Sequence, residues 1–138
     1  MLISYAQTIF EYQAQDSEGV SKLSTLEQAE KSLRKTLPEL EKYREAEPPI
    51  ELLDIWWCFL ELSSQRSSNG SGSANPVSFR DMYYWQQVKG INLGEFEQDV
   101  ILNLDRIWMK VHTETLIKNA KKSADKPAQK TKLPSKRR

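Results

Sequence analysis

The sequence predicts an all-α fold: a small helical bundle of about four to five helices with a disordered basic C-terminal tail. Three observations lead to this prediction. Apolar residues recur at helical spacing in several stretches, helix-capping residues and Pro or Gly mark where those stretches end, and the last residues are rich in Lys, Ala, Ser and Pro. A chain of 138 residues is long enough for one domain with tails.

Residues 1–49 are predicted to form an N-terminal helical region. A short helix is expected at the weakly patterned start. A clearer helix is predicted from Ser24, because Ser24 and Glu27 have the spacing of a capping box. Its narrow apolar stripe comprises Leu26, Ala29, Leu33 and Leu37. This stripe is expected either to dock on the central helix or to pair between subunits.

Proline residues interrupt and then end this region. Pro38 is expected to break or kink the helix, the charged run 39–47 to continue it, and Pro48-Pro49 to end it. Residues 50–117 are then predicted to form the helical core domain. Most large apolar residues lie between Ile50 and Val111, so the core is placed there.

The core domain begins with its most apolar segment, residues 50–66. Apolar side chains lie nearly all round this segment, which predicts a central helix buried by neighbours on several sides. The Ser/Gly/Asn-rich residues 67–76 predict a flexible loop. A helix over 78–89 follows, with a capping pair at Ser78 and Asp81 and a stop at Gly90.

A last long helix is predicted after this turn. Asn92 and Glu95 are expected to cap it, and a heptad-like apolar stripe runs from Phe96 to Val111. Residues 118–138 are predicted to be a disordered tail, because nine Lys or Arg residues and a single acid give it a net charge of +8. The whole chain carries +1, so residues 1–117 form an acidic body of −7.

The sequence argues against an enzyme, a metal site and a cofactor. Cys58 is the only cysteine and lies in an apolar run, which predicts a buried, inert thiol. The only histidine, His112, has no cysteine or serine motif around it, and one Cys with one His cannot build a zinc site. The Gly-rich loop lacks the Lys-Ser/Thr ending of a phosphate-binding loop.

No membrane association is expected. No stretch approaches the roughly 20 apolar residues that a membrane helix needs. The first residues lack the basic lead and the small-residue cleavage site of a signal peptide. A soluble, intracellular protein is therefore predicted.

Nucleic-acid binding is expected only through the 118–138 tail. Residues 78–89 and the helix that follows have the outline of a helix-turn-helix, but the second helix begins with Glu95, Glu97 and Asp99, which would repel phosphates. The basic tail attracts any polyanion without sequence preference, or serves only to keep the chain soluble.

Adjacent tryptophans also suggest a binding surface. Trp56 and Trp57 point about 100° apart on a helix, so one is expected to face the core and the other a flank or a partner.

An ordered pattern of residues resembles a known family. It comprises Trp57, Phe59, Leu60, Leu62, Gln65-Arg66, the Gly/Ser loop, Pro76-Val77-Ser78, Asp81, Trp85, Gly90, Leu93, Phe96 and Leu104-Asp105. Over roughly residues 50–110 the chain is similar to tail assembly chaperones of tailed phages and prophages. The resemblance implies a non-enzymatic protein of the host-cell cytoplasm that binds the tape-measure and tail-tube proteins during assembly and is absent from the finished virion. A homo-oligomer is compatible with it.

In that setting, exposure and residue type suggest candidate partner contacts at Trp56, Arg66, Asn69 in the Gly/Ser loop, Arg80 and Tyr84. Three other functions remain open from the residues. One is a nucleic-acid-associated regulator that uses the basic tail. Another is a structural head–tail connector or tail completion protein. The third is a small phage protein that inhibits a host factor, with an acidic body that mimics nucleic acid.

Overall fold

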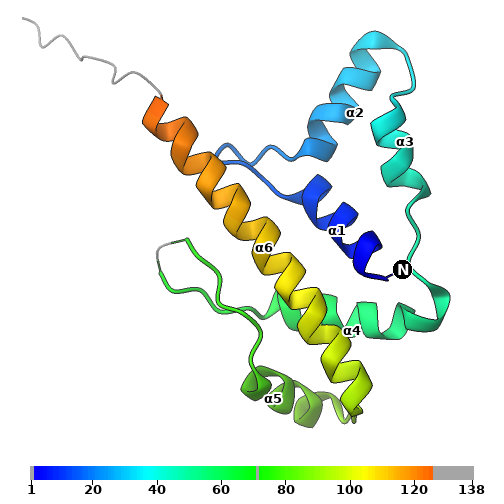
Figure 1. Ribbon diagram of the computed structural model, residues 1–138, viewed down its shortest axis with the longest axis vertical. Helices are drawn as coiled ribbons and strands as arrows, with labels where there is room; N and C mark the ends of the chain where they lie inside the picture. Colours follow the sequence, from blue (N-terminus) through cyan, green and yellow to red (C-terminus); the bar gives the residue numbers. More distant parts are fainter. Residues whose placement is uncertain (1, 71, 126–138) are drawn as a thin grey trace, which may run out of the picture.

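The computed structural model describes residues 2–70 and 72–125, and within them the fold is entirely helical (Figure 1). The elements in chain order are α1 (Leu2–Gln13), α2 (Lys22–Leu33), α3 (Pro38–Glu45), the short 3₁₀ helix η1 (Ile50–Leu52), α4 (Leu53–Ser64), α5 (Phe79–Lys89) and α6 (Glu95–Asp125). The all-α fold class is confirmed, with six α-helices in the part of the chain that is described.

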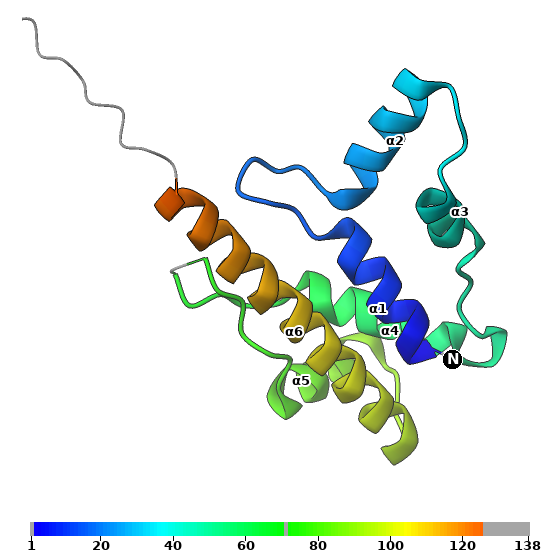
Figure 2. The same cartoon turned by 45° about the horizontal axis from the view of Figure 1, so that its top comes forward.

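Helix α6 is the longest element, and the body of the molecule forms around it. Its 31 residues correspond to about 46 Å. Helices α1 and α4 pack against it (Figures 1 and 2). Phe59 of α4 is fully buried with Ile101 and Leu104 of α6. Within residues 2–70 and 72–125, no helix combines the length and the apolar character needed to cross a bilayer.

Helix α1 belongs to the core, which therefore extends beyond the predicted limits of Ile50 and Val111. Its buried side chains recur at helical spacing and include Leu2, Ala6, Ile9 and Phe10. Phe10 stacks on Trp56 with ring centroids 5.6 Å apart, and Tyr5 meets the same indole edge-on at 5.1 Å. The short apolar pattern at the start of the chain does not reveal its tertiary partner, and for that reason the sequence left open whether residues 1–49 pack on the core.

Helices α2 and α3 form an arm that projects from the body (Figure 2). No side chain of α2 is buried, and its main neighbours are α1 and α3. Docking of the stripe Leu26–Leu37 on the central helix is therefore contradicted. The stripe is also not one helix, because Leu37 caps α3 and Pro38 occupies its first turn. Helix α3 is anchored by buried Leu40.

The helix ends follow local chemistry. Ser78 and Asp81 cap α5 reciprocally, and Gly90 ends it in the left-handed conformation at φ 63°, as predicted. Helix α2 begins one turn earlier than predicted, with Ser21 as its cap. Ser21 has the extended backbone (φ −95°, ψ 160°) that an N-cap requires, and it pairs with Ser24 instead of Ser24 pairing with Glu27.

Both ends of α6 differ from the prediction. The helix starts at Glu95, and the Gly94 carbonyl accepts the Gln98 N–H, so Asn92 lies outside the helix and does not cap it. At the other end, residues 118–125 are helical, which corrects the prediction of a disordered tail from 118 onward. Lys and Ala dominate these eight positions and both favour helix. Residues 126–138, the rest of the predicted tail, lie outside the described residues.

Candidate partner-binding surface

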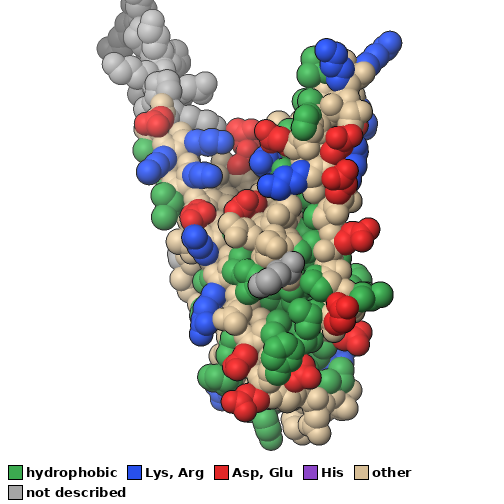
Figure 3. Space-filling model, turned by 45° about the vertical axis from the view of Figure 1, so that its right-hand side comes forward, with side chains coloured by type: hydrophobic (Ala, Val, Ile, Leu, Met, Phe, Trp, Pro, Cys, Tyr) green, Lys and Arg blue, Asp and Glu red, His purple; other side chains and the backbone are tan. Residues whose placement is uncertain are grey.

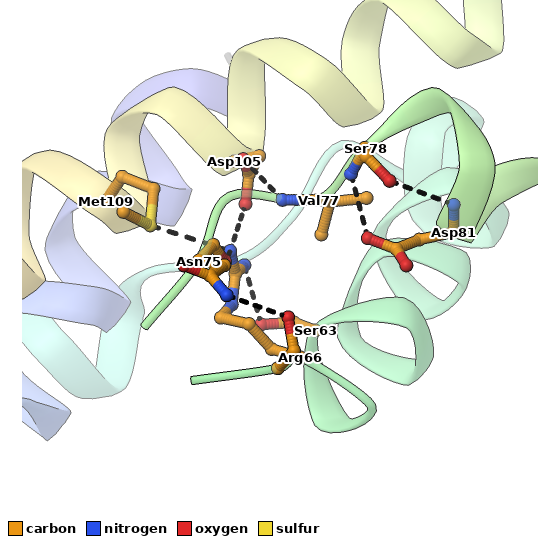
Figure 4. Close-up of polar contacts among 9 residues, drawn as sticks. Ser63, Arg66, Asn75, Val77, Ser78, Asp81, Asp105 and Met109 are labelled. Carbon is orange, nitrogen blue, oxygen red and sulfur yellow. Dashed lines mark hydrogen bonds and ion pairs between the residues drawn. The ribbon is translucent and has the colours of Figure 1, made fainter. Parts of the chain in front are cut away.

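A buried ion pair between Arg66 and Asp105 joins the end of α4 to the middle of α6 (Figure 4). Arg66 Nη1 lies 2.6 Å from Asp105 Oδ1, and each side chain is only 5% exposed. The guanidinium also lies 3.9 Å above the ring of Trp108. A charge pair this deeply buried needs further hydrogen bonds to offset its loss of hydration.

Further hydrogen bonds connect this pair to α4 and to the C-terminal end of the Gly/Ser loop. Arg66 Nη1 donates to the Asn75 carbonyl at 3.0 Å, and Nη2 donates to Ser63 Oγ at 3.1 Å. Asp105 Oδ2 accepts the Val77 N–H at 3.1 Å. Val77 directly precedes the Ser78 cap, so the Arg66–Asp105 pair fixes the start of α5 against α6 (Figure 4).

Next to this pair, a groove of about 490 Å³ runs between α4 and α5. Its lining residues are Glu61, Leu62, Gln65, Arg66, Val77, Asp81, Tyr84, Trp85, Val88 and Lys89. The last turn of α4 lies beside the whole length of α5, and Lys89 at the end of α5 forms an ion pair with Glu61 near the end of α4. We call this the α4–α5 groove.

Large apolar side chains are exposed along the α4–α5 groove. Tyr84 is 56% and Val88 83% exposed, and both line the groove. Trp57, which is 60% exposed, lies one helical turn before Glu61. Helices α1, α5 and α6 pack against α4, but no element among residues 2–70 and 72–125 covers Trp57. The face of α4 that bears Trp57 is therefore open, whereas the prediction was a helix buried by neighbours on several sides.

Acidic residues outnumber basic residues between α4 and the start of α6. On the face that carries the N-terminus, Figure 3 shows apolar side chains gathered in the lower half with acidic side chains around them. Positions 50–99 contain seven acidic and three basic residues. Of the three basic residues, Arg66 is paired with Asp105 and Lys89 with Glu61, which leaves the carboxylates in excess.

The structure separates the five candidate contacts into two groups. Trp56 is 4% exposed and packs in the core, so the expectation that it faces a partner is wrong, and Trp57 is the exposed member of the pair. Arg66 is also buried, and its side chain holds the loop and α6. Tyr84 lines the α4–α5 groove. Asn69 in the loop and Arg80 on α5 are exposed but do not line it.

Sequence reasoning missed Asp105, Trp57 and Val88 as residues of this region. One signal was present for Asp105, since it is a lone acid among the apolar residues of the buried face of α6. A carboxylate in such a position requires a cationic partner. Trp56 and Trp57 are adjacent on one helix, and the angle of about 100° between them does not say which of the two faces outward.

The described residues hold no cluster of metal-ligating side chains, and the single cysteine has a raised pKa. They contain no group of three or more His, Cys, Asp or Glu side chains that could hold a metal ion. Burial raises the pKa of the half-buried Cys58 thiol, and Asp54 and Glu61 raise it further. His112 stacks on Trp108 with ring centroids 4.8 Å apart.

Comparison with known proteins assigns the chain to a family. A family model described as phage tail assembly chaperone matches residues 29–110, which is more than half of the 138 residues. The match includes the last five residues of α2, all of α3, α4 and α5 and the first half of α6, and hence both members of the Arg66–Asp105 pair and the whole α4–α5 groove. No curated protein and no solved structure matches the chain. The resemblance found over residues 50–110 is thus confirmed, and this chain belongs to the phage tail assembly chaperone family.

Proposed function

We propose that this chain assists tail assembly by transiently binding the tape-measure and tail-tube proteins of its own phage or prophage. Membership of the family supports a non-enzymatic chaperone role in tail assembly and partners among tail proteins in general. The identity of the two partners is the proposal.

The observation that carries this proposal is the exposed apolar side chains along the α4–α5 groove. Tyr84 and Val88 lie within the segment that the family model matches, and neither is covered by another part of the described chain. A chaperone needs an accessible apolar surface, because unassembled subunits expose the apolar surfaces that they later bury against one another. The surrounding carboxylates oppose self-association by mutual repulsion, so the surface stays available for a partner.

Co-purification tests the proposal. The tagged chain is co-expressed with the tape-measure and tail-tube proteins of its own genome, and with the major capsid protein as a control, at low and at moderate salt. Recovery of the tape-measure or tail-tube protein without the capsid protein supports the proposal, together with absence of the chain from purified virions. Presence in virions would favour a structural connector or completion protein instead.

The regulator reading has its own outcome in the same experiment. If neither tail protein is recovered but nucleic acid is, and if deletion of residues 126–138 abolishes that recovery, the chain acts through its basic end. This deletion keeps α6, which ends at Asp125, intact. The binding must then fall steeply with salt, since phosphate contacts release counterions.

A further inference from the structure

We propose that the tip of the arm, where α2 ends beside α3, binds an acidic segment of a partner protein through Lys31, Arg34 and Lys35. This surface is separate from the α4–α5 groove, since the two have no lining residue in common. The inference goes beyond the proposed function, because it assigns a second binding surface and does not depend on which protein the groove binds.

A pocket of about 600 Å³ lies at the tip of the arm. Its lining residues are Glu27, Glu30, Lys31, Arg34, Lys35, Thr36 and Arg44. Arg44 belongs to α3 and the others to α2 or to the turn that follows it, so both helices of the arm contribute. We call this the arm pocket. Figure 3 shows Lys and Arg side chains at the top of the arm.

One acid and one base of the arm pocket neutralise each other. Arg44 Nη1 lies 3.1 Å and 3.3 Å from the two carboxylate oxygens of Glu30. The Glu30 side chain is 24% exposed, and this ion pair closes one side of the pocket. Neither charge of the pair is therefore left for a partner.

The remaining charges that line the arm pocket are predominantly positive. Lys31, Arg34 and Lys35 form no ion pair with any residue of 2–70 or 72–125. Glu27 is the single acid of the lining that opposes them, which leaves a net charge of +2. Residues 31–38 contain no acid, so the sequence around the pocket does not compensate this excess. A segment that bears carboxylates complements it.

The backbone at Arg34 is a further indication of function. Arg34 is the C-cap of α2 and adopts the left-handed conformation, with φ 51° and ψ 37°. It is the one non-glycine residue with a positive φ in the described part of the chain. Glycine adopts this conformation without the steric cost that a Cβ brings. Such strained residues cluster at functional sites, and here the strained residue carries a cation that lines the arm pocket.

The residues around the arm pocket favour an acidic protein segment over a nucleic acid. Leu33, which precedes Arg34, is 62% exposed and offers an apolar contact beside the cations. A peptide can place a carboxylate against each cation, an apolar side chain against Leu33 and a neutral residue against Glu27. A nucleic acid carries a charge at every phosphate and so meets Glu27 with the wrong sign. The guanidinium of Arg34 suits a carboxylate in particular, since it can donate two parallel hydrogen bonds to it.

The arm leaves this surface accessible. No side chain of α2 is buried, and the arm projects from the body (Figure 2). All lining residues of the arm pocket except Glu27 lie within the segment that the family model matches. A partner can therefore reach the pocket without displacing any part of the described body.

An NMR titration of the isotope-labelled full chain tests the inference, with a short peptide of Asp and Glu around one Leu as the probe. At about 0.15 M salt, charges more than about 8 Å apart are largely screened, so the local surface decides the affinity. The backbone signals that shift are expected to centre on residues 27–36 and on Arg44. The double variant Lys31→Glu/Lys35→Glu should weaken binding at least about tenfold, because two attractions become repulsions.

The matched control is the double variant Lys42→Glu/Lys121→Glu. It changes the net charge by the same amount, at two exposed positions that do not line the arm pocket. Its affinity for the peptide should change less than about threefold, because the substituted charges are screened from the pocket. A second control is the peptide with Asn and Gln in place of Asp and Glu, which should not bind.

Four outcomes would overturn the inference. Equal losses of affinity in the two double variants would mean that net charge alone attracts the peptide. Shifts that centre outside the arm, or no binding, would exclude the arm pocket as the site. Tighter binding of a single-stranded oligonucleotide to the same residues would make nucleic acid the occupant. The same shifts on concentrating the chain alone would make a second copy the occupant. The proposed function is measured separately by co-purification, so it stands or falls independently of this titration.

Discussion

Removing Asp105 isolates the buried charge of Arg66, and this makes Asp105→Ala the most informative single substitution. Taking away one partner of a buried ion pair costs about 3–5 kcal/mol, because the other charge is left without compensation. The Val77 N–H loses its acceptor at the same time. Arg66 keeps Ser63, the Asn75 carbonyl and the Trp108 ring, which places the expected loss near the lower limit, at about 3 kcal/mol.

Urea unfolding followed by tryptophan fluorescence measures this loss, since Trp108 lies directly against the guanidinium. A domain of this size has about 5–15 kcal/mol of stability, so the midpoint should fall markedly. Asp99→Ala is the control on the same helix, because Asp99 is exposed and its removal should cost about 0.5 kcal/mol or less. The double variant Arg66→Met/Asp105→Leu removes both charges and should regain most of the loss. Equal midpoints for Asp105→Ala and Asp99→Ala would refute this reasoning.

Three further substitutions or measurements test other contacts. Ser78→Ala removes the acceptor of the Asp81 N–H, and it should lower the free energy of unfolding by about 1 kcal/mol in urea unfolding. A cost near zero would mean that the Arg66–Asp105 pair alone fixes the start of α5. Tyr12→Phe removes the 3.0 Å hydrogen bond from the Tyr12 hydroxyl to the Glu39 carbonyl, and it should lower the free energy of unfolding by about 1 kcal/mol. An unchanged urea midpoint would show that this contact between α1 and α3 adds nothing to global stability. Burial raises the pKa of the Cys58 thiol, so iodoacetamide should modify the folded chain more slowly at pH 8 than the urea-unfolded chain, and the rate of the folded chain should level off at a higher pH than that of the unfolded chain. Equal rates at pH 8 would contradict the raised pKa.

Features encoded by neighbouring residues could be predicted from the sequence. The Ser78–Asp81 cap and the Gly90 stop were predicted correctly, because each depends on a few adjacent residues and on backbone geometry alone. The whole ordered pattern from Trp57 to Leu104-Asp105 likewise led to the correct family. The cap of α2 was misplaced by one turn, since Ser21 and Ser24 are both competent capping residues and only the backbone distinguishes them.

Features that depend on distant residues could not be predicted. Arg66 and Asp105 are far apart in the sequence, and the sequence does not show that each is the partner of the other until α4 and α6 are packed together. For the same reason Arg66 was taken for a surface contact. The apolar residues of α1 are compatible with a surface or a core position, and only docking on α4 and α6 decides between them.

The absence of buried side chains in α2 has a kinetic consequence. Its principal links to α3 include the exposed Lys22–Glu39 ion pair and the Arg44–Glu30 pair, and such pairs each contribute about 1 kcal/mol or less. Local opening of α2 thus requires far less free energy than global unfolding, so its amides should exchange with solvent orders of magnitude faster than those of α4 and of the buried half of α6. The chain accordingly contains two regimes of motion: a body that opens only when the whole fold is lost, and an arm whose first helix melts and re-forms many times while that body stays intact.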